Sequence, residues 1–148
     1  IITRRNIKNL FISLTVLMER FLEIESTVDN LCRVEEFIDL IFLDFNLSKN
    51  VYSRVYLSVI EAVNNAFFHG NQNIISKKVK ISFFDDILSF RFIIEDEGLG
   101  FDFFLVQDPT YIQNLRKESG RGIFIMKHYA DEVCFLNKGS VVKLLFNK

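Results

Sequence analysis

Two polar residues, Glu61 and Asn65, are set four positions apart in a run that otherwise has the apolar spacing of a buried helix. At i and i+4 their side chains project from one helical face, one above the other. A carboxylate and an amide oxygen arranged in this way suit a hydrated metal ion or an activated hydroxyl. The alternative is that Glu61 lies at the solvent edge and Asn65 acts as a cap.

Two glycine-bearing segments follow this helix. Residues 96–102 read D-E-G-L-G-F-D, and residues 118–123 read E-S-G-R-G-I just before a helical pattern. Glycine lets a backbone approach a ligand closely, although turns alone also explain such pairs. The three elements in order, E-x-x-x-N, then D-x-G-x-G, then G-x-G before a helix, are much more specific than any one of them.

The three segments resemble the N, G1 and G2 boxes of the histidine-kinase-like (GHKL) ATPase superfamily. Within it, the nearest likeness is to anti-sigma factor serine/threonine kinases of the RsbW and SpoIIAB type. The likeness runs from about residue 20 to the end, and it includes D-P-T at 108–110. Position 64 departs from the pattern, because Asn64 stands where threonine is frequent. The resemblance implies a Bergerat-type α/β fold, a two-layer sandwich of a mixed, mainly antiparallel sheet with helices on one face.

The resemblance also implies an adenine-binding role for Asp96. A carboxylate at the end of a buried strand suits that role, because the exocyclic amine of adenine needs an acceptor in an otherwise apolar slot. Gly98 and Gly100 would let the main chain pass close to the base and the sugar. The alternative for both glycines is a simple turn.

Phosphate binding is expected at Gly120, Arg121 and Gly122, because the first N–H groups of a helix are unpaired and its dipole favours anions. Arg121 either adds a charge-assisted contact or points to solvent. The expected metal is Mg²⁺, which takes few protein oxygens besides those of the phosphates of ATP. By resemblance Asn65 supplies that oxygen, and Glu61 is the general base for a serine hydroxyl. The alternative is that Glu61 only orders metal-bound water.

The resemblance therefore implies a cytoplasmic, ATP-dependent serine protein kinase that is also an anti-sigma factor. Its partners would be a sigma factor and an anti-sigma factor antagonist of the STAS type, which it phosphorylates, and it would form a homodimer. Two alternatives stay open. One is a non-catalytic, ATP-gated protein-binding module, and the other is a detached ATPase domain of a histidine kinase.

Composition agrees with one compact domain. The chain has 148 residues, a hydrophobic fraction of 49% and 17 phenylalanines, which suffice for a real core and argue against disorder. A formal charge of −1 gives no general electrostatic reason to bind nucleic acid or an anionic membrane. Cys32 and Cys134 are expected to be reduced core cysteines. The apolar run 7–18 is too short for a membrane helix.

Hydrophobic periodicity predicts the elements that must position these residues. The first helix is expected to be capped by Ser26 or Asp29 and the second by Ser48. In chain order the expected elements are a strand at 21–25, a helix to about 45, a second helix carrying Glu61 and Asn65, a hairpin of 79–83 and 88–95, a helix at 122–129, and a hairpin of 132–137 and 141–146.

Residues 19–148 are expected to form the ATPase domain, and residues 1–18 an N-terminal extension or an added strand. The segment 103–119, which carries Thr110, Tyr111, Arg116 and Lys117, is expected to close over the nucleotide as a lid. His69 is expected to close the pocket or cap the helix. His128 stands on a helix patterned for packing and is assigned no chemistry.

Overall fold

The structure, a computed structural model, describes residues 19–100 and 120–148. Within these ranges one sheet has the strand order β1-β2-β3-β5-β4. Its strands are β1 (Glu19–Glu25), β2 (Lys78–Asp85), β3 (Ser89–Asp96), β4 (Glu132–Leu136) and β5 (Val141–Asn147). Every pairing among them is antiparallel, so the parallel pairing implied by a mixed sheet is not found in the described part of the chain. The predictions for 1–18 and 103–119 lie outside the described residues.

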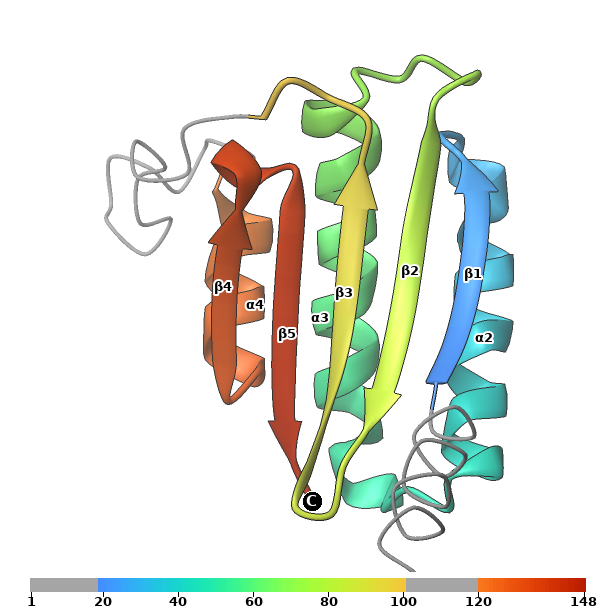
Figure 1. Ribbon diagram of the computed structural model, residues 1–148, viewed down its shortest axis with the longest axis vertical. Coiled ribbons are helices and arrows are strands. Elements are labelled where there is room, and N and C mark those ends of the chain that lie inside the picture. Colours follow the sequence, from blue (N-terminus) through green and yellow to red (C-terminus); the bar gives the residue numbers. More distant parts are fainter. Residues whose placement is uncertain (1–18, 101–119) are drawn as a thin grey trace, which may run out of the picture.

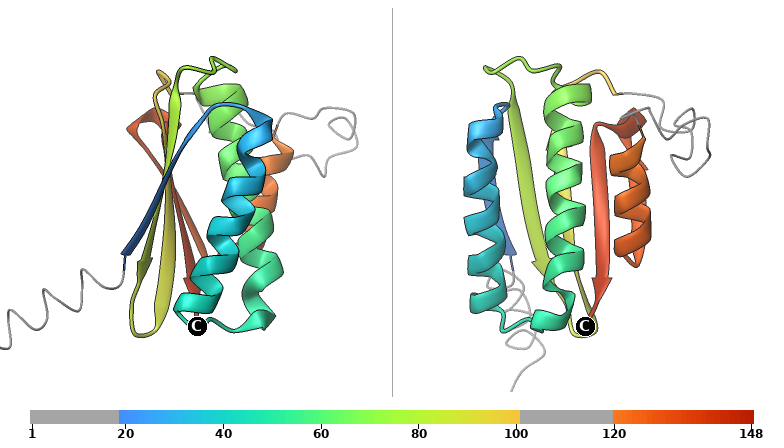
Figure 2. Two further views of the ribbon diagram at one scale, coloured as in Figure 1. Left: turned by 90° about the vertical axis from the view of Figure 1, so that its right-hand side faces the viewer. Right: turned by 180° about the vertical axis from the view of Figure 1, so that it is seen from behind.

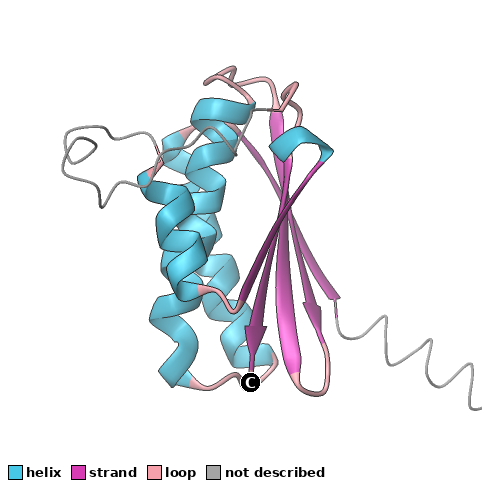
Figure 3. Ribbon diagram, turned by 90° about the vertical axis from the view of Figure 1, so that its left-hand side faces the viewer, coloured by secondary structure: helices cyan, strands magenta, loops and turns pink. Residues whose placement is uncertain are grey.

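Three helices of the described ranges, α2 (Leu31–Asp44), α3 (Tyr52–Asn65) and α4 (Arg121–Tyr129), lie against one face of the sheet (Figures 1 and 2). Figure 3 shows the resulting helix layer and sheet layer from the side. This arrangement confirms the two-layer α/β sandwich that the sequence predicts. The apolar face of each helix and the inner face of the sheet bury each other.

The core lies between the two layers, and alternation along the strands puts its residues on one face. On β3, Phe90, Phe92 and Ile94 are buried, and the intervening side chains face the other side. The predicted helical stripes are buried in the same way, with Val34, Ile38, Ile41 and Phe42 from α2 and Val55, Val59, Ala62 and Val63 from α3.

The β2–β3 hairpin fixes the position of Asp96. Antiparallel register pairs Val79 with Asp96, the last residue of β3. The Asp96 N–H then donates to the Ser140 carbonyl just before β5, at 2.9 Å. Because buried residues alternate along β3, the Asp96 side chain lies on the helix side of the sheet. Its place at the end of a strand is the one that the sequence predicts.

The capping predictions have different outcomes. Ser48 is confirmed as a cap, because its Oγ accepts from the Asn50 N–H at 3.3 Å in the turn that leads into α3. Neither Ser26 nor Asp29 caps α2, whose N-cap position is Asn30. Ser26 is instead buried and donates to the Lys77 carbonyl at 2.9 Å, so a tertiary partner replaces the local one.

Cys32 and Cys134 are both free, but the prediction that they lie in the core is wrong, because both are exposed. Cys32 lies in the first turn of α2, where its Sγ donates to the Asp29 carbonyl. Cys134 alternates with the half-buried Val133 and Phe135 on β4, and it therefore faces the side of the sheet without helices.

Candidate functional site

Three chain segments end at the same edge of the sandwich, at the top of Figure 1. They are the C-terminal end of α3 with the π-helical turn Ala66–Gly70 that follows it, the C-terminal end of β3, and the N-terminal end of α4. The three sequence motifs lie on these three segments. The fold thus gathers the predicted site residues at one edge, although they are spread over more than fifty positions of the sequence.

Glu61 and Asn65 lie on the face of α3 that contacts the first turn of α4. A Cβ atom added at Gly122 would lie 2.7 Å from Glu61 Oε2 and 3.3 Å from Asn65 Oδ1. Both polar side chains therefore contact the Gly122 backbone, and only glycine leaves them room in their present positions. The fold thus brings the E-x-x-x-N segment and the second glycine pair together.

The first glycine segment packs equally closely on the end of the π-helical turn. A Cβ atom at Gly70 would lie 2.3 Å from the Asp96 carboxylate, and one at Gly98 would lie 2.1 Å from the Gly70 carbonyl oxygen. The Gly98 N–H donates to Asp96 Oδ1 at 2.8 Å. Asp96 is thus held between two backbone segments, and one of its oxygens already has a donor.

Asn71 stabilises this arrangement through the hydrogen bonds of its side chain. It is fully buried, and its Nδ2 donates to Ser26 Oγ at 2.8 Å and to the Lys78 carbonyl at 2.9 Å. Its Oδ1 accepts from the Glu97 N–H at 2.8 Å. The Glu97 carboxylate in turn accepts from the Lys78 N–H. One amide therefore fixes the loop after Asp96 to the start of β2 and to the chain before α2.

Gly120 and Gly100, the remaining glycines of the two predicted pairs, have backbone roles. Gly120 has φ 95° at the N-cap of α4, a left-handed conformation that glycine adopts without strain, and its carbonyl accepts from the Phe124 N–H at 3.0 Å. Gly100 has φ 86°, and a Cβ there would lie 2.3 Å from the Lys138 carbonyl oxygen. Packing on the β4–β5 turn is therefore sufficient to require glycine at position 100.

Both carboxylates at this edge have raised pKa values. Burial raises the pKa of Glu61, while the positive charge of Arg121 lowers it by a smaller amount. Burial also raises the pKa of Asp96, against smaller opposite effects from the Gly98 N–H and the Lys77 charge. Two half-buried carboxylates at one edge with raised pKa values are typical of a functional site.

The residues at this edge fit a magnesium–nucleotide complex. Close backbone packing at Gly122 places the N-terminal end of α4, whose first N–H groups have no partner inside the helix, beside an amide oxygen and a carboxylate. In the described parts of the chain no three histidine, cysteine or acidic side chains cluster as metal ligands. Asn65 is the neutral oxygen ligand that the site offers, as suits an ion bound mainly through phosphates.

The comparison with known families decides the identity of the fold. The sequence profile described as "Histidine kinase-like ATPase domain" matches residues 24–146, from β1 to β5. The chain belongs to this family. No curated protein matches it significantly. Histidine kinase-like ATPase domains bind ATP, usually with Mg²⁺, which agrees with the charges and N–H groups gathered at this edge.

The two histidines of this ATPase domain differ in position. His69 lies within the π-helical turn Ala66–Gly70, next to the Gly70 that contacts Asp96. His128 is exposed on α4 and stacks on Phe124, with ring centroids 6.1 Å apart. His128 lies outside the three motif-bearing segments, and no chemistry is assigned to it. In the described ranges no helix is long and apolar enough to cross a lipid bilayer.

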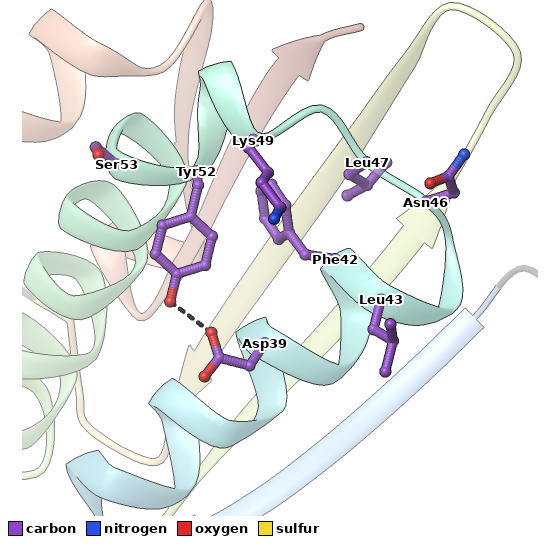
Figure 4. A pocket seen from close by; sticks show the side chains of 8 residues that line it. All are labelled: Asp39, Phe42, Leu43, Asn46, Leu47, Lys49, Tyr52 and Ser53. Atoms are coloured by element: carbon purple, nitrogen blue, oxygen red, sulfur yellow. Dashed lines mark hydrogen bonds between the residues drawn. The ribbon is translucent and has the colours of Figure 1, made fainter.

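A pocket of about 470 Å³ lies at the opposite end of the ATPase domain, between the end of α2 and the start of α3 (Figure 4). The Tyr52 hydroxyl donates to Asp39 Oδ1 at 2.6 Å across it. This hydrogen bond, together with burial, raises the pKa of Tyr52 to about 12. Glu61 and Asn65 lie two or more helical turns farther along α3, so this pocket is separate from the motif-bearing edge.

Sequence reasoning missed the residues that support the site. Gly70 and Asn71 belong to none of the three motifs, yet Gly70 contacts Asp96 and Asn71 anchors the loop beyond it. No local pattern identifies these roles, because Asn71 and Ser26 are 45 positions apart.

Proposed function

We propose that this chain is an ATP-dependent serine protein kinase and anti-sigma factor. In a partner switch it would bind a sigma factor and phosphorylate a serine of a STAS-type anti-sigma factor antagonist. The choice of partners, and of a homodimer as the working unit, rests on the resemblance to kinases of the RsbW and SpoIIAB type. The observation that carries the catalytic part is the contact of both Glu61 and Asn65 with Gly122.

In this proposal each residue acts on one part of the reaction. ATP supplies the phosphoryl group, and Mg²⁺ offsets its charge. Asp96 accepts a hydrogen bond from the adenine amine, with Gly98 and Gly100 passing close to the base and sugar, and Asn65 offers its amide oxygen to the metal. The N–H groups at Gly120 to Gly122, with Arg121, bind the phosphates.

Glu61 is the proposed general base. Its carboxylate would accept the proton of the serine hydroxyl as the oxygen of that hydroxyl bonds to the γ-phosphorus of ATP, while the bond from that phosphorus to ADP breaks and ADP leaves. Burial strengthens it as a base, because a raised pKa brings a carboxylate nearer to the pH at which it works. The positive charge of Arg121 opposes this effect and lowers the pKa of Glu61 by a smaller amount.

The experiment is to incubate the protein with γ-labelled ATP and Mg²⁺ together with each candidate antagonist from the same genome. Label is expected on one antagonist, and its transfer is expected to be lost when the acceptor serine is replaced by alanine. Asp96→Asn is the matched control, and it should lose ATP binding while keeping its fold. Label on no antagonist, with ATP still changing partner affinity, would exclude the kinase and leave an ATP-gated binding module. Label on a histidine would favour the histidine kinase alternative.

A further inference from the structure

Arg54 ties the first turn of α3 to the last turn of α4. Its Nε donates to the Tyr129 carbonyl oxygen at 2.9 Å, and its Nη2 lies 3.1 Å from Asp131 Oδ1. Tyr129 is the last residue of α4, so its carbonyl has no partner inside the helix. A guanidinium at this end also interacts favourably with the helix dipole.

Asp131 extends this connection to the sheet. Its other oxygen, Oδ2, accepts from the Asn147 N–H at 2.9 Å, and its own N–H donates to the Leu145 carbonyl at 2.9 Å. The C-terminal end of α4 is therefore fixed to both β5 and α3 through two side chains. Both are at least half-buried, with 37% of the Arg54 side chain and 29% of the Asp131 side chain exposed.

The same face of α3 carries Glu61 and Asn65. Arg54 and Glu61 are seven residues apart, which is about two helical turns. Between them lies Ser58, which is fully buried and whose hydroxyl has no hydrogen-bond partner. On α4, Met126 is likewise fully buried. At Ser58 and Met126 the two helices are thus held by packing, and no hydrogen bond of the Ser58 hydroxyl opposes a shift of α4 along its axis.

We propose that Arg54 is a positioning residue for phosphate binding, and this inference rests on the proposed function. Through Tyr129 and Asp131 it fixes the C-terminal end of α4, and so sets where the N-terminal end lies relative to Glu61 and Asn65. Apolar contacts are not directional, whereas two hydrogen bonds to a planar guanidinium define a position. Since α4 is only nine residues long, a shift at one end moves the other by the same amount.

The test is Arg54→Met, which keeps the aliphatic stem but removes both contacts. Binding of Mg·ATP is expected to weaken by about tenfold, because small misplacements at a phosphate site have large effects. Binding of adenosine, measured by competition, is expected to stay unchanged, because Asp96 lies on β3 and not on α4. Arg54→Lys should give an intermediate loss of ATP affinity, and Arg33→Met on the exposed face of α2 is the matched control.

Asp131→Asn provides a second variant if Arg54→Met fails to fold, and it should show the same selective loss of ATP affinity over adenosine. Equal losses for ATP and adenosine, or no loss for either, would overturn the positioning role. The two proposals fail differently. A wild-type protein that binds ATP but labels no serine contradicts the proposed kinase, whereas unchanged ATP affinity in Arg54→Met and Asp131→Asn contradicts only the role of Arg54.

Discussion

Gly122 on α4 and Glu61 on α3 approach so closely that a methyl group at position 122 would lie 2.7 Å from the Glu61 carboxylate. The atom in the way is the far end of a flexible side chain and not backbone. A side chain at position 122 is therefore compatible with the fold but not with the present position of Glu61.

Gly122→Ala is accordingly expected to separate stability from activity. Alanine favours a helix over glycine by about 1 kcal/mol, so thermal stability should be unchanged or slightly higher. Phosphoryl transfer should fall by roughly a hundredfold, because the displaced Glu61 no longer reaches the hydroxyl. Paired melting and single-turnover measurements check both parts. Lys127→Ala, on the exposed face of α4, is the control, and normal transfer by Gly122→Ala would show that Glu61 need not occupy its present position.

The pKa of Glu61 predicts a pH-dependent effect on stability. Because burial raises this pKa in the folded protein, the folded state holds the proton more tightly than the unfolded chain. That contribution to stability is present below the ordinary glutamate pKa and is lost as the pH rises through the raised value. Glu61→Gln should therefore raise the melting temperature at neutral pH and have little effect near pH 4, where wild type is protonated.

Differential scanning fluorimetry at the two pH values measures this difference. Glu36→Gln changes an exposed carboxylate on α2 and should move the melting temperature little at either pH. A Glu61→Gln variant that melts below wild type at neutral pH would contradict a raised pKa. The carboxylate would then be a stabilising group in the folded protein.

The buried amide of Asn71 predicts a large loss of stability on truncation. Asn71→Ala leaves the Glu97 N–H and the Lys78 carbonyl without their partner. We expect the free energy of unfolding to fall by about 3 kcal/mol. Urea unfolding gives the value, with Asn50→Ala on the exposed turn before α3 as the control. A loss no greater than that of the control would mean that water replaces the amide without cost.

Local patterns in the sequence are enough to predict the helices and the hairpins, whereas the edge at which the three motifs meet is found only in the fold. The apolar spacing of Val34, Ile38 and Ile41 determines which side of α2 is buried, and the alternation around Phe90 and Phe92 does the same for β3. These predictions succeed because a helix or strand needs only its own periodicity to select a buried face.

Predictions failed where a distant partner decides the outcome or where periodicity was not applied. Ser26 has the residue type and place of an N-cap, yet its hydroxyl donates to the Lys77 carbonyl and accepts from Asn71 Nδ2, both from elsewhere in the chain. Cys134 was assigned to the core by residue type, although the alternation of Val133 and Phe135 already places it on the other face. The contact of Arg54 with Tyr129 joins residues 75 positions apart, and no local pattern contains it.

The proposed kinase activity requires Glu61 to act as the base in phosphoryl transfer from ATP to serine. The most direct measurement is the single-turnover rate of Glu61→Gln beside its Mg·ATP affinity, with wild type and Asp96→Asn in the same assay. If Glu61 is the base, we expect Glu61→Gln to bind ATP with an affinity within a few fold of that of wild type and to transfer the phosphoryl group roughly a hundredfold or more slowly. Transfer by Glu61→Gln at the wild-type rate, with ATP bound as tightly, would contradict it.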